Sequence, residues 1–448
     1  MPGFLIDRIA PYLNYRSYRS PSLAFQTVQV FLTRVGGRGL TLLSILTLTR
    51  WLGLTAFGRY TYIVSWVAIL TIPSLGMETL VVREAAFARR RNDADGFGGL
   101  LRWSVGNTLW VSGAVTLGGL IAVFIYALGA SQGVQLSTML GLAGIPLICL
   151  QTLAGAVFRG CRQTGLTAFL SDIISPAVMT VWAGSCLMIG IRASTSMALS
   201  GWLAILSLVL LIYVFLLPRL NFKWRWNSAV PDQIAAWRKS LVSLTMLKGI
   251  TIAAGRLPLI LLGLFIGPEP VALFSLSFRI AGFVCLTLSI VSMTIAPRLA
   301  ELQARQDRAA MQRLVTRSTM AISAWAIPVA VILILFGRWI LGWFGPQFKA
   351  GYPFLLVLLV GQAVDAVTGN VSLVMNMAGM ERVVARVHAA GFILTTGICL
   401  LLIPRWGAMG AAIGATSALV FSNVFLAVYL YRRLGITTVW PARAPRTL

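Results

Sequence analysis

The sequence predicts an all-α polytopic membrane protein with about twelve transmembrane helices, arranged as two six-helix bundles around a central cavity. Three observations support this fold class. Of the 448 residues, 58% are hydrophobic and only 11% are charged, and the mean hydropathy is +0.84. The apolar residues gather in segments of about 20, the length that crosses the hydrocarbon core of a bilayer. Lysine and arginine lie mainly in alternate connecting loops, as the positive-inside rule requires.

Twelve apolar segments are the expected spans, and each ends where charged or turn-forming residues begin. In the first half they are 26–48, 60–82, 103–128, 136–158, 168–191 and 197–217. In the second half they are 240–266, 271–296, 319–341, 352–375, 387–403 and 408–431. With the N-terminus inside, the loops on one side carry 26 lysines and arginines and those on the other side carry 6. This asymmetry places both termini in the cytoplasm and favours an even number of spans.

The longest polar connections divide the chain. We expect a cytoplasmic tail at 1–25, an N-terminal six-helix bundle at 26–217, a cytoplasmic linker at 218–239, a C-terminal six-helix bundle at 240–431 and a second cytoplasmic tail at 432–448. The stretch 298–318, rich in arginine and glutamine, is the other long cytoplasmic loop. Because each half has six spans, both halves have the same orientation, as in a parallel repeat about the membrane normal.

The composition also excludes several functions. The net charge of +25 is spread over many short loops, so it fits membrane orientation better than nucleic-acid binding. The five cysteines have no paired spacing, and the single histidine, His388, lies at a predicted loop–helix boundary without a second ligand nearby. We therefore expect no metal, no other cofactor and no catalytic residue. A phosphate-binding loop of an ATPase is also missing from the sequence.

Five basic side chains have too little room outside the membrane. Between Arg38 and Arg50 lie eleven uncharged residues, which at about 1.5 Å each fall far short of the ~30 Å core. Arg38 and, one turn earlier, Arg34 are therefore expected inside the first span. The short intervals after 239 place Lys248 and Arg256 in the seventh span by the same test.

These basic residues suggest an anion site. Arg279 in the eighth span is the fifth candidate, although it could lie near the external interface. Basic groups at the bilayer centre cost about 2.5–3.5 kcal/mol each on insertion scales, so several of them indicate a hydrated cavity that handles an anion. Two alternatives stay open: Arg34 and Arg38 could extend to the headgroups, and Lys248 or Arg256 could pair with a buried carboxylate.

The tenth span carries a polar stripe at helical spacing, formed by Gln362, Asp365, Gly369, Ser372 and Asn376. Asp365 lies near the midplane, where it could pair with Lys248 or Arg256 or titrate as a coupling-ion site. Gln362 and Asn376 are further cavity candidates. Two other acidic residues, Glu78 and Asp172, lie near the cytoplasmic ends of their spans, where we expect the interface to solvate them.

Five stretches of the chain look familiar. They are TRWLGLTAFGRYTYIVS from Thr49, SLGMETLVVREAA from Ser74, IAPRLAELQ from Ile295, FGPQFKAGYPFLLVLLVGQ from Phe344 and LLIPRWGAMGAAIGATSA from Leu401. Together they resemble the polysaccharide transporter (Wzx-type) branch of the multidrug/oligosaccharidyl-lipid/polysaccharide (MOP) flippase superfamily. Its members usually have fourteen helices, whereas twelve are expected here.

The resemblance implies a flippase rather than an enzyme. Such proteins carry undecaprenyl-diphosphate-linked oligosaccharide repeats across the bacterial inner membrane for exopolysaccharide, capsule or O-antigen synthesis. It also implies that Arg34 and Arg38 match the cavity arginines assigned to diphosphate binding in related lipid II flippases, with a less secure match at Lys248 and Arg256. The expected partners are the lipid-linked oligosaccharide and membrane lipids, with a polysaccharide polymerase and glycosyltransferases as candidates and no nucleic acid. The alternatives are a multidrug antiporter of the same superfamily and a membrane glycan polymerase or ligase.

Overall fold

The computed structural model describes residues 23–91, 93–126, 132–219 and 231–438, and these residues form helices without any strand. The first half of the chain folds into α2 (Leu23–Leu70), α3 (Ile72–Arg91), α4 (Ala94–Tyr126), α5 (Gln132–Gly160), α6 (Thr164–Ala168), the π-helical η2 (Phe169–Ile174), α7 (Ser175–Ile189), α8 (Thr195–Leu216) and the 3₁₀ turn η3 (Leu217–Arg219). The short segments α6, η2 and α7 run on into one another and correspond to the fifth predicted span.

The second half contains α9 (Pro231–Phe265), α10 (Pro268–Ala281), α11 (Leu286–Ala304), α12 (Arg308–Trp343), the 3₁₀ turn η4 (Pro346–Gly351), α13 (Tyr352–Thr368), α14 (Val371–Met377), α15 (Glu381–Trp406) and α16 (Ala408–Leu434). Several boundaries differ from the prediction. Helix α9 begins inside the predicted linker 218–239, and most of the predicted loop 298–318 is helical. His388 lies within α15 rather than at a loop boundary.

Helix length and composition confirm a polytopic all-α membrane fold. Among the described residues, ten helices are long and apolar enough to cross a bilayer, or eleven if the bent pair of α10 and α11 is one span. One of the ten, Val35–Leu70, contains a break at Gly53 that separates the first two predicted spans. The count therefore agrees approximately with the twelve predicted spans. Large apolar side chains such as Trp110 and Met188 are exposed on the outer surface, as expected where lipid surrounds the protein.

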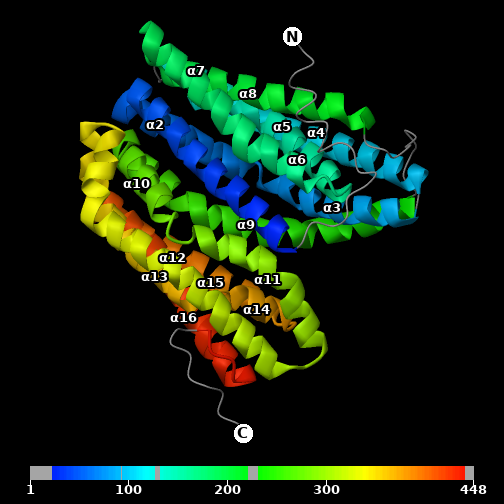
Figure 1. The fold of residues 1–448 in the computed structure, drawn as a ribbon. Coiled ribbons are helices and arrows are strands. Elements are labelled where there is room, and N and C mark those ends of the chain that lie inside the picture. The colour runs from blue at the N-terminus through cyan, green and yellow to red at the C-terminus, as the bar shows by residue number, and fades with distance from the viewer. Residues whose placement is uncertain (1–22, 92, 127–131, 220–230, 439–448) are drawn as a thin grey trace.

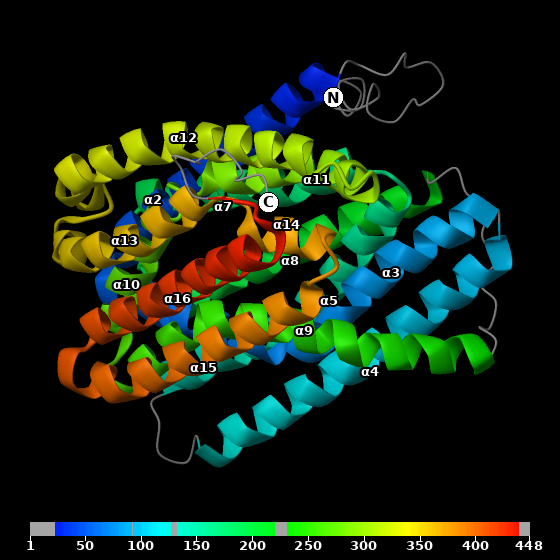
Figure 2. The same cartoon turned by 90° about the horizontal axis from the view of Figure 1, so that it is seen from below.

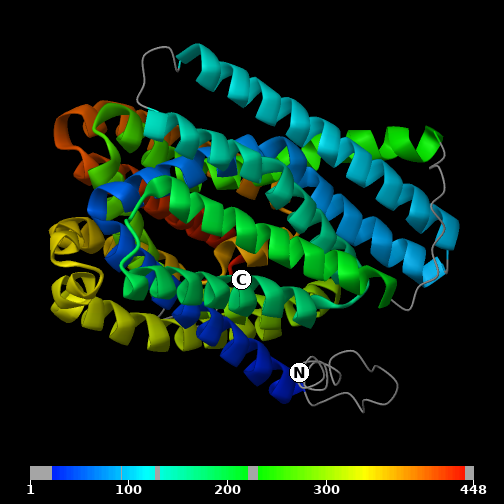
Figure 3. The ribbon, with the colours of Figure 1, turned by 90° about the horizontal axis from the view of Figure 1, so that it is seen from above.

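The two halves of the chain lie side by side at one end and diverge toward the other. Figure 1 shows the blue-to-green half above the yellow-to-red half, meeting near the end of α10 and separating toward α3 and α16. Figure 2 shows α9 between α15 on one side and α3 and α4 on the other. From the opposite side, Figure 3 shows the cyan and green helices of the first half covering the assembly. Helix α9 is thus the second-half helix that packs most extensively against the first half.

Separate apolar clusters hold the halves together and stabilise each of them. The largest buried cluster joins both halves and includes Phe57 of α2, Phe274 of α10 and Phe348 of η4. A second cluster lies in the first half and takes in Trp237 of α9, whose ring centroid is 5.3 Å from that of Trp103. A third cluster belongs to α11, α12, α14, α15 and α16.

Two predicted continuous spans are interrupted. The eighth span bends by 48° between α10 and α11, where the carbonyl of Phe283 accepts a hydrogen bond from Trp325 Nε1 at 3.2 Å. The tenth span breaks at Gly369, whose φ of 64° and ψ of −148° end α13. A Cβ at this glycine would lie 2.5 Å from Thr319 Oγ1, so the break also allows α12 to approach closely. The prediction of one polar stripe along a single helix was therefore wrong.

The turn at Gly53 supplies a test of the fold. Gly53 has φ of 71° and ψ of −175°, a backbone region that side chains other than glycine occupy at a cost of about 1–3 kcal/mol. Gly53→Ala is expected to lower the free energy of unfolding by that amount, measured as a lower thermal midpoint in detergent. Gly106→Ala in α4 is the control, because the added methyl group meets no atom within 4 Å. An unchanged midpoint for Gly53→Ala would contradict the turn.

Candidate functional site

A cavity of about 520 Å³ lies between the two halves of the protein. Its wall on the first half comes from α2, α3 and α5, and its wall on the second half comes from α9 and α10. Most of the lining is apolar, but Arg256 and Arg279 both belong to it. The structure therefore places two of the five predicted basic residues in one cavity, contributed by two different helices.

Helix periodicity explains why both arginines face this cavity. On α9, the lining residues Ile252, Arg256 and Leu259 follow one another at spacings of four and three, which keeps them on one face of the helix. On α10, Ser275, Phe278 and Arg279 share a face in the same way. Each arginine is thus directed inward by the register of its helix rather than by a side-chain partner.

Arg256 and Arg279 lack counter-ions within the part of the chain that the structure describes. Both side chains are partly buried, and no carboxylate there forms an ion pair with either of them. Arg256 and Arg38 also lie close enough to Arg279 for the positive charges to repel. An uncompensated charge at membrane depth is expensive, so water or an anionic ligand in the cavity has to solvate these groups.

Lys248 lies in a different environment. Its Nζ is 2.5 Å from Oε2 of Glu78, while the other carboxylate oxygen, Oε1, is 2.7 Å from Nη2 of Arg159. We call these three residues the Glu78 cluster. The expectation that the interface alone solvates Glu78 was wrong, and the alternative that Lys248 pairs with a carboxylate describes what the structure shows. The cluster has two positive charges and one negative charge, so it keeps a net charge of +1.

The remaining predicted basic residues lie on α2. The side chain of Arg38 is exposed. Its positive charge acts on that of Arg279 in α10, so it lies on the side of α2 that faces the second half of the chain. The next residue back, Gly37, contacts the backbone of Asp172 in η2, where an added Cβ would lie 2.8 Å from the carbonyl oxygen. The side chain of Arg34 lies outside the described residues.

Asp365 has a neutral partner rather than a basic one. Its Oδ1 accepts a hydrogen bond from Asn423 Nδ2 at 2.9 Å. The thiol of Cys285, which also neighbours Asp365, donates its hydrogen bond to the carbonyl of Gln362 at 3.3 Å. The suggested pairing of Asp365 with Lys248 or Arg256 is not observed. Asn376 is exposed on α14, beyond the helix break, so it does not continue the face that carries Asp365.

The two halves touch closely at the end beyond the cavity. Thr55 Oγ1 donates to Glu269 Oε1 at 2.7 Å, and Arg50 Nε donates to the carbonyl of Trp343 at 2.5 Å. The glycine Gly58 packs against the backbone of Pro268, where an added Cβ would lie 1.9 Å from the carbonyl oxygen. We call this contact region the closed end. It is the end that the charge asymmetry of the loops assigns to the outside.

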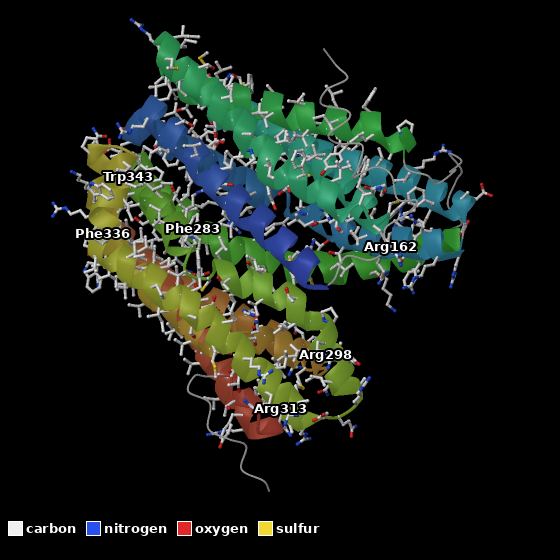
Figure 4. The ribbon with its side chains drawn as sticks, viewed as in Figure 1. Arg162, Phe283, Arg298, Arg313, Phe336 and Trp343 are labelled. Atoms are coloured by element: carbon white, nitrogen blue, oxygen red, sulfur yellow. The ribbon has the colours of Figure 1, made fainter. Side chains whose placement is uncertain are left out.

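Basic residues mark the opposite, diverging end. Figure 4 shows Arg162 on the first half and Arg298 and Arg313 on the second half toward this end, whereas Phe336 and Trp343 lie near the closed end. Phe283 lies between them, at the bend that follows α10. The distribution of charge in three dimensions thus agrees with the alternation of charge along the chain.

Sequence reasoning missed Arg159, which was counted as a loop residue. Arg159 lies in the last turn of α5 and reaches Glu78 of α3 across 81 positions of sequence. Helical periodicity could not identify this contact, since it depends on how α3, α5 and α9 pack together. The scarcity of acidic residues is the one available signal: with 12 carboxylates against 37 basic side chains, any acid within a span is a candidate partner.

The chain is similar in sequence to a probable flippase and to a putative transporter. No family model matches the chain. A probable flippase, AglR, from Haloferax volcanii is 22% identical over 395 residues, which cover 83% of this chain and 76% of the relative. A putative O-antigen transporter from Shigella flexneri is 24% identical over 170 residues, covering 38% of this chain and 40% of the relative.

Solved structures agree on the fold. A multidrug resistance MATE family transporter of the MOP superfamily, in an inward-facing conformation, superimposes with a TM-score of 0.75 at 12% identity and covers 90% of this chain and 98% of its own. The lipid II flippase MurJ in an inward closed conformation superimposes with a TM-score of 0.69 at 13% identity, covering 90% and 87%. The chain has the fold of these transporters, and its relatives in sequence are flippases and an O-antigen transporter.

Proposed function

We propose that this flippase of the MOP superfamily, which resembles the Wzx-type polysaccharide transporters, carries a diphosphate-linked oligosaccharide on a polyprenyl lipid from one leaflet to the other. The observation that supports the substrate class is the pair of arginines, Arg256 and Arg279, in one cavity between the halves. A diphosphate would supply the counter-ion that these two arginines lack among the described residues. The sequence relatives named above support a glycan-related cargo.

The energetics favour an anion at this position. At an effective dielectric constant near 20, one contact between opposite charges at about 4 Å contributes roughly 4 kcal/mol before desolvation losses. Two or three such contacts would offset much of the cost of bringing a diphosphate into the membrane. Arg38 could supply the third contact, since it lies near Arg279. The proposed diphosphate site therefore consists of Arg38, Arg256 and Arg279, with Arg34 and Lys248 as further candidates.

The closed end suggests how the cycle proceeds. If the termini are cytoplasmic, the closed end faces outward and the two halves diverge toward the inside (Figure 1). Rocking of the two halves about the cavity would then expose it to the other side. The sugars travel with the diphosphate through the interior, and the polyprenyl tail stays in the lipid. In this scheme the protein lies in a bacterial inner membrane and serves the synthesis of an exopolysaccharide, a capsule or an O-antigen.

Asp365 is the proposed coupling site. It forms no ion pair with a lysine or arginine among the described side chains, and its neighbours are Asn423, Cys285 and, at longer range, His388. A carboxyl group in such surroundings can exchange a proton or bind a small cation during the cycle. Gln362 contributes its carbonyl group to the same region.

The alternative functions have less support. A multidrug antiporter shares the fold, but the two cavity-lining ionisable side chains described here are both cationic, which disfavours a cationic drug. A glycan polymerase or ligase would require catalytic acid–base groups, and the sequence relatives are transporters.

Flipping in proteoliposomes tests the proposal. An undecaprenyl-diphosphate oligosaccharide is followed from one leaflet to the other with wild type, Arg279→Gln and Arg313→Gln. We expect Arg279→Gln to reduce the rate by at least about tenfold, because one charge-assisted contact contributes about 1.5–3 kcal/mol. Arg313 is exposed at the diverging end (Figure 4), so its variant should keep the wild-type rate. Equal rates for the two variants would refute the cavity site.

A further inference from the structure

We propose that Lys248 and Arg159 form a second anion subsite, which the carboxylate of Glu78 occupies in this conformation and yields to a phosphate group of the substrate. Glu78 would then be a displaceable internal counter-ion. The inference rests on the proposed function, because it assigns the phosphate group to the cargo of the same cavity. It adds Arg159 and Glu78 to the residues that handle this cargo.

The position of the Glu78 cluster supports this role. Leu75 of α3 lines the cavity, and Glu78 follows it by three residues, about one helical turn. On α9, Thr251 and Ile252 line the cavity, and Lys248 precedes them by three and four residues. Both partners are therefore one turn beyond the cavity wall, on the same side. The cluster borders the cavity at the contact between α3 and α9, on the side of the diverging end.

The charges of the cluster also favour exchange. One carboxylate bridges two cations through its two oxygens, at 2.7 Å to Arg159 and 2.5 Å to Lys248. A phosphate group presents more oxygens and more negative charge, so it can make the same two contacts and neutralise both cations. The side chains of Glu78, Arg159 and Lys248 are 29%, 32% and 33% exposed. Because they are partly solvated, separating Glu78 from its partners costs less than breaking a dry ion pair.

Displacement would have a consequence for the conformation. Glu78 and Arg159 belong to the first half of the chain, whereas Lys248 belongs to α9 of the second half. While Glu78 holds Lys248, it also ties α3 to α9 across the seam. A phosphate that takes over the two cations releases Glu78, so substrate arrival would exchange the tie between α3 and α9 for a phosphate bridge between Arg159 of α5 and Lys248 of α9. A merely structural ion pair would instead stabilise the seam without affecting anion binding.

Binding of inorganic pyrophosphate separates these possibilities. The protein is placed in nanodiscs of zwitterionic lipid at low salt, and the Kd is measured by calorimetry for wild type, Glu78→Gln and Glu84→Gln. Glutamine keeps the shape of glutamate but removes the competing charge, so we expect Glu78→Gln to bind pyrophosphate about tenfold more tightly. Glu84 lies on the same helix and pairs with Arg83, so the control removes an equal charge and should leave the Kd unchanged.

Two double variants test whether Lys248 and Arg159 form the subsite. Adding Lys248→Gln or Arg159→Gln to Glu78→Gln should abolish the gain in affinity, because the proposed subsite consists of these two cations. If Glu78→Gln does not fold, Glu78→Asp replaces it. This carboxylate is shorter by one methylene group, so we expect it to hold the two cations less well and to tighten binding too. Unchanged or weaker binding in a folded Glu78 variant would overturn the proposal. A gain in affinity that persists when Lys248 or Arg159 is also replaced would overturn it too.

The same titration keeps this inference distinct from the proposed function. Loss of pyrophosphate binding in Arg256→Gln/Arg279→Gln, together with an unchanged Kd in Glu78→Gln, would support the cavity site and overturn the internal counter-ion. The opposite result would be a tenfold gain in affinity in Glu78→Gln that requires Lys248 and Arg159, together with an unchanged Kd in Arg256→Gln/Arg279→Gln. It would support the second subsite and contradict the cavity site.

Discussion

Replacing Arg256 and Arg279 together with glutamine is expected to slow flipping by at least about a hundredfold while making the protein more stable. The loss follows because two charge-assisted contacts to the diphosphate disappear, each of about 1.5–3 kcal/mol. The gain follows because the two guanidinium groups repel each other across the cavity and form no ion pair with a carboxylate among the described residues. Their insertion costs about 2.5–3.5 kcal/mol each at the bilayer centre.

A lower flipping rate together with a higher thermal midpoint in this double variant distinguishes a binding site from a structural one. The measurements are the flipping rate in proteoliposomes and the thermal midpoint in detergent. A matched control is Arg313→Gln/Arg317→Gln, which removes two exposed arginines from α12 and should change neither quantity. If the cavity variant loses both transport and stability, the arginines support the fold instead of binding cargo.

The second large effect is expected at the closed end. Gly58→Ala places a methyl carbon 1.9 Å from the carbonyl oxygen and 2.6 Å from the carbonyl carbon of Pro268. Neither atom belongs to a flexible side chain, so α2 and α10 have to separate. The hydrogen bond between Thr55 and Glu269 lies at the same contact and should be lost with it. The conformation shown here would then be disfavoured.

We expect Gly58→Ala to reduce the flipping rate at least about tenfold, because a cycle that cannot close this end stops. Spin labels at two exposed positions near the closed end, Arg59 and Arg338, report the separation of the halves. The label distance should increase in Gly58→Ala and stay unchanged in Gly113→Ala, whose added methyl group meets no atom within 4 Å. A wild-type distance together with wild-type transport in Gly58→Ala would show that this contact does not gate the cycle.

Short intervals between charges were the main basis for predicting basic residues within the spans. They placed Arg38 and Arg256 within spans, whereas Arg279 was a candidate that could also lie near the external interface. In the structure the charges of Arg38 and Arg256 both act on that of Arg279. The intervals indicate depth because a helix of given length either crosses the bilayer or does not, so a basic residue within an interval too short to span has to lie inside. This inference uses only local distances along the chain.

The same approach failed where contacts depend on packing between helices. It left open whether Lys248 has a partner, and it identified neither Glu78 as that partner nor Arg159 as the second cation that Glu78 binds. It also read 352–375 as one helix, because a glycine is compatible with an apolar helix and only the approach of Thr319 reveals the break. The amide of Asn423, which binds Asp365, lies 58 positions away and carries no charge to suggest the pairing.

By itself, the sequence determined the membrane class and the approximate number of spans, and it predicted which basic side chains lie at membrane depth. These follow from hydropathy and length, because the bilayer acts on each segment separately. The tertiary structure alone decided which of those charges stay unpaired in the cavity and which are neutralised by Glu78. That choice depends on the rotation and packing of α3, α5, α9 and α10 against one another, since a difference of one helical turn separates a residue that lines the cavity from one that pairs beyond its wall.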